Sequence, residues 1–200
     1  MKQPTKYAIL ISLVIGMVLF SLSFWQGKEN AFLLLNTDLG LAADYFFQYW
    51  THTADGVIWV PIVLLTFFFK RRQLLLVISS IIFSTLFAQL SKNIFFKGSP
   101  RPALAIPDHS LFHSVTGVEL HSLNSFPSGH TTTAFTIFLL GTILINKKWA
   151  LPVGLLYGIL AGYSRIYLAQ HFPVDVAGGI IAAILTVLIS IAIQNKWVKN

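Results

Sequence analysis

The chain has 200 residues, of which 55% are hydrophobic and only 10% are charged. A soluble globular domain carries about a quarter charged residues, so this composition excludes that class and indicates an integral membrane protein. The chain has no cysteine, which excludes disulfides, thiolate metal sites and a thiol nucleophile. The net charge of +7 would suit nucleic acid, but in a membrane chain basic residues more often face the cytoplasm and anionic headgroups, so we expect no nucleic-acid partner.

Six apolar stretches approach the length of about 20 residues that a helix needs to cross a bilayer. They cover residues 7–25, 51–69, 74–91, 131–145, 150–168 and 174–193. We therefore predict an all-α fold with one domain over residues 1–200, an integral membrane bundle of six transmembrane helices. The stretch 131–145 is short, and 51–69 contains His52, Asp55 and Pro61 near its start. The first stretch is predicted to be a retained signal-anchor helix.

Charges divide unevenly between the two sides of this six-span arrangement. One side carries only basic residues, namely Lys2, Lys6, Lys70, Arg71, Arg72, Lys147, Lys148, Lys196 and Lys199. By the positive-inside rule this side is the cytoplasm, which places both termini there. All acidic residues and histidines fall on or near the opposite side, so we expect the chemistry of this protein to face outward.

Residues 41–50 place aromatic side chains at helical spacing behind Asp38, which we expect to cap a helix. This pattern predicts an interfacial helix on the outer leaflet, and a loop with buried aromatic anchors is the alternative. The longest polar connection follows at residues 93–126 and contains three prolines and three histidines. Long connections of this kind tend to be functional.

Gly154, Gly158 and Gly162 recur every four residues in the fifth predicted span. Small residues at this spacing let a neighbouring helix approach closely. We expect that neighbour to belong to the same chain rather than to a second copy, since five other helices are available. Accordingly, a monomer is favoured.

Ser128 and Gly129 precede an apolar helix in the sequence Pro127-Ser128-Gly129-His130. A serine here caps the helix, whose free N–H groups and positive dipole end then favour an anion. Glycine lets a phosphate oxygen approach the backbone without a side chain in the way. His130 would stand beside that oxygen as a candidate general acid. Taken alone, such a histidine is more often a cap or a surface residue.

His171 and Asp175 lie four residues apart and share one face if a helix begins there. The carboxylate would accept a proton from one imidazole nitrogen and leave the other free to attack, which makes His171 a candidate nucleophile. Arg165 precedes them without a nearby acid in sequence. An arginine that extends to the membrane surface is the simpler interpretation of Arg165 alone.

Lys92 and Arg101 add positive charge from the end of the third predicted span and from the long connection. Arginine grips phosphate through two parallel hydrogen bonds, whereas lysine acts as a point charge. Together with Arg165 they could neutralise a phosphoryl group in its transition state. For Lys92 alone, anchoring of a helix end is an equally good interpretation.

These residues resemble the three signature motifs of the type-2 phosphatidic acid phosphatase superfamily, which includes bacterial membrane lipid phosphatases and soluble vanadium haloperoxidases. The resemblance covers residues 92–175. Two motifs match in full: Pro127-Ser128-Gly129-His130, and Ser164-Arg165 followed after five residues by His171 and after three more by Asp175. The first motif departs from the family pattern, which places six residues between its lysine and Arg-Pro. Here eight residues lie between Lys92 and Arg101, and three lie between Lys97 and Arg101. We predict that Lys92 is the lysine of the motif, and Lys97 is the alternative.

The resemblance implies a six-helix membrane core and hydrolysis without metal or other cofactor. It further implies a phosphohistidine on His171, oriented by Asp175, and protonation of the leaving oxygen by His130. The phosphate would be held by Lys92, Arg101, Ser128, Gly129 and Arg165.

The expected substrate is a membrane lipid phosphate that reaches the outward site by lateral diffusion in a bacterial inner membrane. Undecaprenyl diphosphate, phosphatidic acid, phosphatidylglycerol phosphate and the 1-phosphate of lipid A remain alternatives at this point. So do a lipid phosphotransferase that uses the same histidine, and a non-enzymatic anion-binding membrane protein. The haloperoxidase activity is disfavoured, because it belongs to soluble members. His52, His109, His113 and His121 are expected to be ordinary loop residues.

Overall fold

The computed structural model describes residues 3–198, so Lys2 and Lys199, which enter the charge argument, lie outside the described residues. Helices joined by turns and loops make up this part of the chain, and no β-strand occurs within residues 3–198. The predicted all-α class is therefore confirmed. The helices are α1 (Gln3–Gln26), α2 (Lys28–Leu35), α3 (Leu41–Trp50), α4 (Trp59–Phe69), α5 (Leu74–Leu90), α6 (Pro102–Ala105), α7 (Gly129–Leu144), α8 (Ala150–Tyr167) and α9 (Pro173–Trp197).

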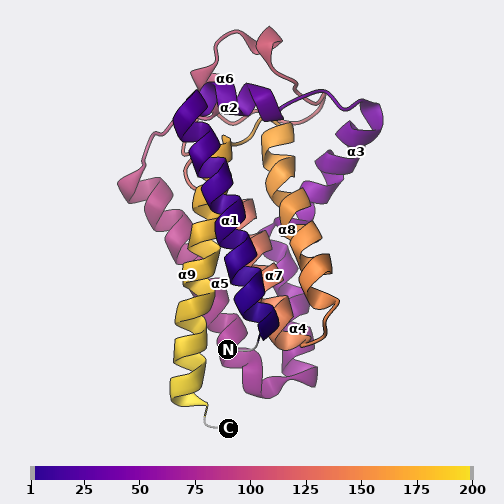
Figure 1. Ribbon diagram of the computed structural model, residues 1–200, viewed down its shortest axis with the longest axis vertical. Coiled ribbons are helices and arrows are strands. Elements are labelled where there is room, and N and C mark those ends of the chain that lie inside the picture. The colour runs from indigo at the N-terminus through magenta and orange to yellow at the C-terminus, as the bar shows by residue number, and fades with distance from the viewer. Residues whose placement is uncertain (1–2, 199–200) are drawn as a thin grey trace.

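The longer helices run side by side along the long axis of the molecule, and α2, α6 and the long connection gather at one end (Figure 1). Helix α9 packs against both α1 and α5, while α7 lies between α8 and α9. Buried Phe135, Phe138 and Ile180 fill the space among these helices. Segments far apart in sequence therefore meet at the loop-bearing end, where α7 and α9 begin and α8 ends.

Three helical stretches are long and apolar enough to cross a membrane by themselves: Gln3–Gln26, Arg71–Phe95 and Pro173–Trp197. A fourth arises if Leu41–Ala54 and Gly56–Phe69, which meet at a bend of 55°, form one broken span. Helix α7 is apolar but shorter than these. These helices fit a membrane bundle, whereas the count of six spans stays a prediction.

The stretch 51–69, expected as one continuous span, is α-helical only from Trp59 onward. Its first part forms two 3-10 turns, Thr51–Ala54 and Gly56–Ile58, with Asp55 between them in an extended conformation. Pro61 supplies a physical reason, since proline is best tolerated in the first turn of an α-helix. The 3-10 segment places Thr51 and Asp55 at the loop-bearing end of the bundle.

Helix α3 occupies the residues predicted for it, Leu41–Trp50, but Asp38 is not its cap. Gly40 holds the cap position with φ of 85°, a left-handed conformation that glycine adopts without strain. Asp38 Oδ1 instead accepts a hydrogen bond from the Gly40 N–H at 2.7 Å. Tyr45 and Tyr49 are largely exposed, and the interfacial position of α3 stays a prediction.

The glycines of α8 pack against α7 within the same chain. A Cβ at Gly154 would lie 2.6 Å from Phe138 Cδ2, and one at Gly158 would lie 3.4 Å from Phe135 Cε2. Both phenylalanines belong to α7, so the close helix approach expected from the spacing is intrachain.

Gly179 of α9 lies against the start of α7. A Cβ there would come within 2.7 Å of the Ser128 carbonyl oxygen and 2.9 Å of Thr131 Cβ. These are a backbone atom and a β-branched side chain, neither of which can move without shifting the helix. The missing side chain of Gly179 therefore sets how closely the first turn of α7 can approach α9.

We predict that Gly179→Ala lowers the free energy of unfolding by about 1–3 kcal/mol, because the added methyl group overpacks this contact. The measurement is thermal unfolding of the purified protein in detergent. Gly141→Ala is the matched control, since nothing lies within 4 Å of a Cβ at Gly141. Helix propensity should make that variant equally stable or up to about 1 kcal/mol more stable. Equal stability of the two variants would contradict the packing argument.

Candidate active site

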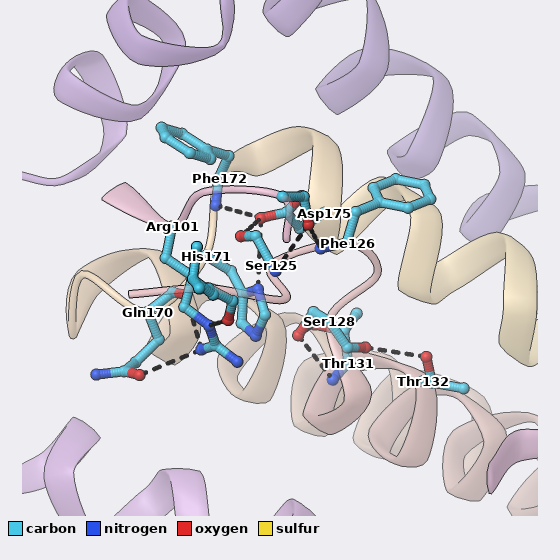
Figure 2. Close-up of polar contacts among 12 residues, drawn as sticks. Arg101, Ser125, Phe126, Ser128, Thr131, Thr132, Gln170, His171, Phe172 and Asp175 are labelled. Carbon is cyan, nitrogen blue, oxygen red and sulfur yellow. Dashed lines mark hydrogen bonds and ion pairs between the residues drawn. The ribbon is translucent and has the colours of Figure 1, made fainter. Parts of the chain in front are cut away.

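The predicted site residues gather at the end of the bundle where α7 and α9 begin. Figure 2 shows Arg101, Ser128, His171 and Asp175 close together, although they come from three segments of the chain. All four are buried, and so is Arg165. The site is therefore an enclosed polar cluster above an apolar bundle.

Ser128 caps α7, as the sequence predicts. Its Oγ accepts hydrogen bonds from the Thr131 N–H at 3.4 Å and from the Thr131 hydroxyl at 2.9 Å. Its own N–H donates to the Asp175 carbonyl oxygen at 3.0 Å, which ties the start of α7 to the first turn of α9. An oxyanion beside this turn would meet a positive dipole end and free N–H groups.

Lys92, rather than Lys97, lies beside this helix start. A Cβ at Gly129 would be 3.8 Å from Lys92 Nζ, whereas Lys97 is exposed. Helix α5 continues into a π-helical turn at Ser91–Phe95, and this turn carries Lys92. The sequence left open whether Lys92 or Lys97 lies near the other cations. In the structure it is Lys92 that does so.

Arg101 is fixed by the chain around it. Its Nε donates to the Leu123 carbonyl oxygen at 2.9 Å, and its Nη1 donates to the Gln170 carbonyl oxygen at 3.1 Å and to Gln170 Oε1 at 3.4 Å. Burial lowers the pKa of Arg101, yet a guanidinium keeps its proton at neutral pH. Gln170 was not predicted, and only its position next to His171 could have suggested it.

Arg165 is buried in the last turn of α8 rather than extended to the membrane surface. Its Nη1 donates to Thr51 Oγ1 at 2.5 Å, and its Nε has no hydrogen-bond partner among the described residues. A buried guanidinium with a free donor is suited to an anionic ligand. The Arg165 carbonyl oxygen accepts from the His171 N–H at 3.0 Å, so the two residues are fixed relative to each other.

His171 and Asp175 face each other, as their spacing predicts. His171 Nδ1 lies 3.4 Å from Asp175 Oδ2, and the same oxygen accepts from the Phe172 N–H at 2.9 Å and from the Ser125 hydroxyl (Figure 2). Ser125 is fifty residues away in sequence, so no local pattern could have identified it. Three donors thus hold the carboxylate that orients His171.

The environment of His171 keeps its imidazole neutral. Burial lowers the pKa of His171 well below its ordinary value, and the positive charges of Arg101, Arg165 and Lys92 lower it further. With Nδ1–H directed at Asp175, the lone pair of Nε2 is free. A neutral, oriented imidazole among three cations is equipped to attack a bound phosphate.

His130 has a partner that the sequence analysis did not predict. His130 Nε2 lies 2.7 Å from Asp55 Oδ1, and the other carboxylate oxygen of Asp55 lies 2.8 Å from His52 Nδ1. Asp55 belongs to the irregular segment before α4, so local spacing gave no indication of this contact. His52 is thus more than an isolated loop histidine.

Of the other three loop histidines, His121 lines a cavity together with His130 and Arg165, whereas His109 and His113 contact groups outside the cluster of cations. His109 Nε2 contacts the Ala103 carbonyl oxygen at 2.9 Å, and His113 Nε2 contacts Asp44 Oδ1 at 2.8 Å. Tyr167 also donates to Asp44, and Asn36 accepts from the His113 N–H, so His113 holds the long connection to α3 and α8. His121 is exposed.

Comparison with known proteins places these residues in a family. Residues 73–199 match the PAP2 superfamily, and this match covers more than half of the chain. Over 86 residues the chain is 37% identical to the undecaprenyl-diphosphatase BcrC of Bacillus subtilis, across 43% of this chain and 40% of that protein. It is 28% identical over 144 residues to an undecaprenyl-diphosphatase of Sulfolobus acidocaldarius, across 69% of this chain and 64% of that protein. The chain thus spans less than two thirds of both relatives.

Among solved structures, the chain resembles LpxE of Aquifex aeolicus with a TM-score of 0.69 and 31% sequence identity. The similarity covers 80% of this chain and 92% of that one. The shared fold therefore extends over most of this chain.

We predict that inorganic phosphate raises the thermal stability of the wild type, and that Lys92→Gln abolishes this increase. A ligand at ten times its dissociation constant stabilises by about 1.4 kcal/mol, which a thermal-unfolding series in increasing phosphate resolves. Lys97→Gln is the matched control and should respond like the wild type, because Lys97 is exposed outside the cluster. The opposite pattern would assign the first-motif lysine to Lys97.

Proposed function

The chain belongs to the PAP2 superfamily, and on that premise we propose that it is a metal-independent phosphatase of membrane lipid phosphates with undecaprenyl diphosphate as its substrate. The environment of His171 is the observation that best supports phosphatase activity. Its side chain is buried and neutral, and it faces Asp175 among three cations. The substrate is favoured by two relatives, which are named undecaprenyl-diphosphatases. Phosphatidic acid, phosphatidylglycerol phosphate and lipid A 1-phosphate share the recognised phosphate and are the competing substrates.

The reaction proceeds in two steps. His171 Nε2 attacks the terminal phosphorus of the diphosphate in line with the bridging oxygen. The N–P bond forms, the bond from the terminal phosphorus to the bridging oxygen breaks, and undecaprenyl phosphate departs as His130 gives its proton to that oxygen. Water then attacks the phosphohistidine, His130 takes a proton from that water, and the N–P bond breaks to release inorganic phosphate. The His171 ring returns to its neutral form hydrogen-bonded to Asp175.

Charge stabilisation is the second component of the mechanism. The phosphoryl oxygens would lie between Lys92, Arg101 and Arg165, with Ser128 and the Gly129 N–H at the start of α7. Positively charged and N–H donors that are fixed before the reaction lower the barrier without having to reorganise. The hydrogen bonds that fix Arg101 and Arg165 serve this purpose.

The position of the site relative to the membrane determines how a lipid substrate would reach it. The distribution of basic residues favours cytoplasmic termini and a site at the outer face of a bacterial inner membrane. A lipid phosphate would then reach the site by lateral diffusion with its chain still in the bilayer. We propose that one chain suffices, because all the residues of this mechanism belong to a single copy.

We predict that the wild type releases inorganic phosphate from undecaprenyl diphosphate in detergent with a metal chelator present, and that His171→Ala lowers this activity at least a thousandfold. Removal of the nucleophile eliminates the covalent route itself. The measurement is phosphate release from a panel that also contains phosphatidic acid, phosphatidylglycerol phosphate and lipid A.

His109→Ala is a matched histidine control, because His109 contacts only the long connection, and it should keep wild-type turnover. Loss of activity on adding the chelator, or near-normal turnover by His171→Ala, would contradict the mechanism. Phosphate transfer to an added lipid or sugar acceptor in place of release would identify a phosphotransferase. Phosphate binding without turnover of any lipid would identify an anion-binding protein.

A further inference from the structure

Asp55 lies between two histidines at the outer rim of the site. Its Oδ1 is 2.7 Å from His130 Nε2, and its Oδ2 is 2.8 Å from His52 Nδ1. All three side chains, together with Arg165, line a cavity of about 300 Å³. This carboxylate lies outside the three sequence motifs, and the mechanism above assigns it no role.

The hydrogen bond between His130 and Asp55 determines which ring nitrogen of His130 is available to a substrate. An ionised carboxylate is an acceptor only, so His130 Nε2 must carry the hydrogen that it donates to Asp55. The remaining ring nitrogen, Nδ1, is then the one available to a substrate. This division is the same as in a catalytic histidine whose second nitrogen is held by a carboxylate.

Charge gives the carboxylate a second effect on the same ring. His130 and Arg165 face one cavity, and a cationic imidazole beside a buried guanidinium is unfavourable unless a negative charge compensates. Asp55 supplies negative charge in direct contact with the ring and opposes the lowering of the His130 pKa by burial and by Arg165, and a bound phosphate dianion would add to this compensation. Its side chain is 37% exposed, whereas that of His130 is 28% exposed, so both remain accessible from the outer side.

We propose that Asp55 is the positioning residue of the general acid: it holds His130 with Nδ1–H toward the leaving oxygen and compensates the charge of the protonated ring. This proposal rests on the proposed phosphatase function. In the first step the proton moves from His130 Nδ1 to the leaving oxygen, and the ring becomes neutral with Nε2–H still donated to Asp55. In the second step Nδ1 regains a proton from the attacking water.

The tether of the 3-10 segment supports this assignment. Thr51 Oγ1 accepts from Arg165, and the Thr53 carbonyl oxygen accepts from the Tyr157 hydroxyl at 2.8 Å. Both donors belong to α8, so the segment that carries Asp55 is fixed to the helix that carries a phosphate-binding cation. Such fixation is what a group that must orient a catalytic ring requires.

The test uses the dependence of the reaction on its leaving group. The test needs an alkyl monophosphate, because the group that departs from undecaprenyl diphosphate is itself a phosphate and leaves readily. A lipid alkoxide departs from phosphatidic acid, one of the competing substrates, only with a proton, whereas p-nitrophenolate departs from p-nitrophenyl phosphate without one. Asp55→Asn should therefore lower kcat on phosphatidic acid about tenfold to a hundredfold and kcat on p-nitrophenyl phosphate less than threefold. His130→Gln should show the same selectivity, and Asp55→Asn should cost less than threefold when added to His130→Gln.

Asp108→Asn is the matched control, because Asp108 accepts from the Ser110 N–H in the exposed part of the long connection, and it should match the wild type on both substrates. A carboxylate that only balanced Arg165 or stabilised the fold would lower both activities by one factor in Asp55→Asn, which would overturn the proposal. So would an Asp55→Asn variant as active as the wild type. Asp55→Glu, which keeps the charge, should retain more phosphatidic acid turnover than Asp55→Asn. Failure of the wild type to release phosphate from any lipid would instead contradict the proposed function.

Discussion

The contact between the first turns of α7 and α9 is the constraint on which the rest of the site depends. The Ser128 N–H donates to the Asp175 carbonyl oxygen at 3.0 Å, and Gly179 leaves the space in which the Ser128 carbonyl lies. Two helix starts are thereby held side by side at one end of the bundle. One supplies Ser128, Gly129 and His130, and the other supplies the carboxylate that faces His171. The apolar lengths of both helices fix this arrangement by packing within the bundle.

Positive charge is concentrated at this contact. Arg101 and Arg165 are buried, and Lys92 lies beside Gly129. Buried cations are costly when they are not compensated, and Arg165 Nε lacks a partner among the described residues. A bound phosphate would accept hydrogen bonds from these cations. Its negative charge would offset the free-energy cost of burying them away from water. Burial of the His171 ring, together with these positive charges, lowers its pKa and keeps the imidazole neutral.

Sequence reasoning identified the parts of this arrangement that depend on local geometry. The Ser128 cap follows from its position at a helix start, and the structure bears it out. His171 and Asp175 face each other as their spacing of four residues predicts, although His171 lies two residues before α9 begins. The close approach of α7 and α8 follows from the glycine repeat in the same way. The helical class follows from composition and apolar length alone.

The remaining features depend on contacts between distant segments. Ser125, Gln170 and Asp55 become partners of site residues only when the long connection and the 3-10 segment fold over the bundle. The continuous helix expected at residues 51–69 is interrupted because Asp55 is extended and Pro61 favours a helix start near Trp59. This interruption brings Asp55 to His130. The irregular segment before α4 therefore contributes a side chain to the site that a continuous helix was not expected to supply.

The central claim is that a phosphoryl group is transferred to His171. The most direct test mixes terminally labelled undecaprenyl diphosphate with the wild type for milliseconds, quenches in alkali, which preserves phosphohistidine, and maps the label by mass spectrometry of proteolytic fragments. The account predicts label on the fragment that contains His171, lost on acid treatment and absent from His171→Ala. Full turnover with no labelled protein at any quench time, or label on another residue, would contradict it.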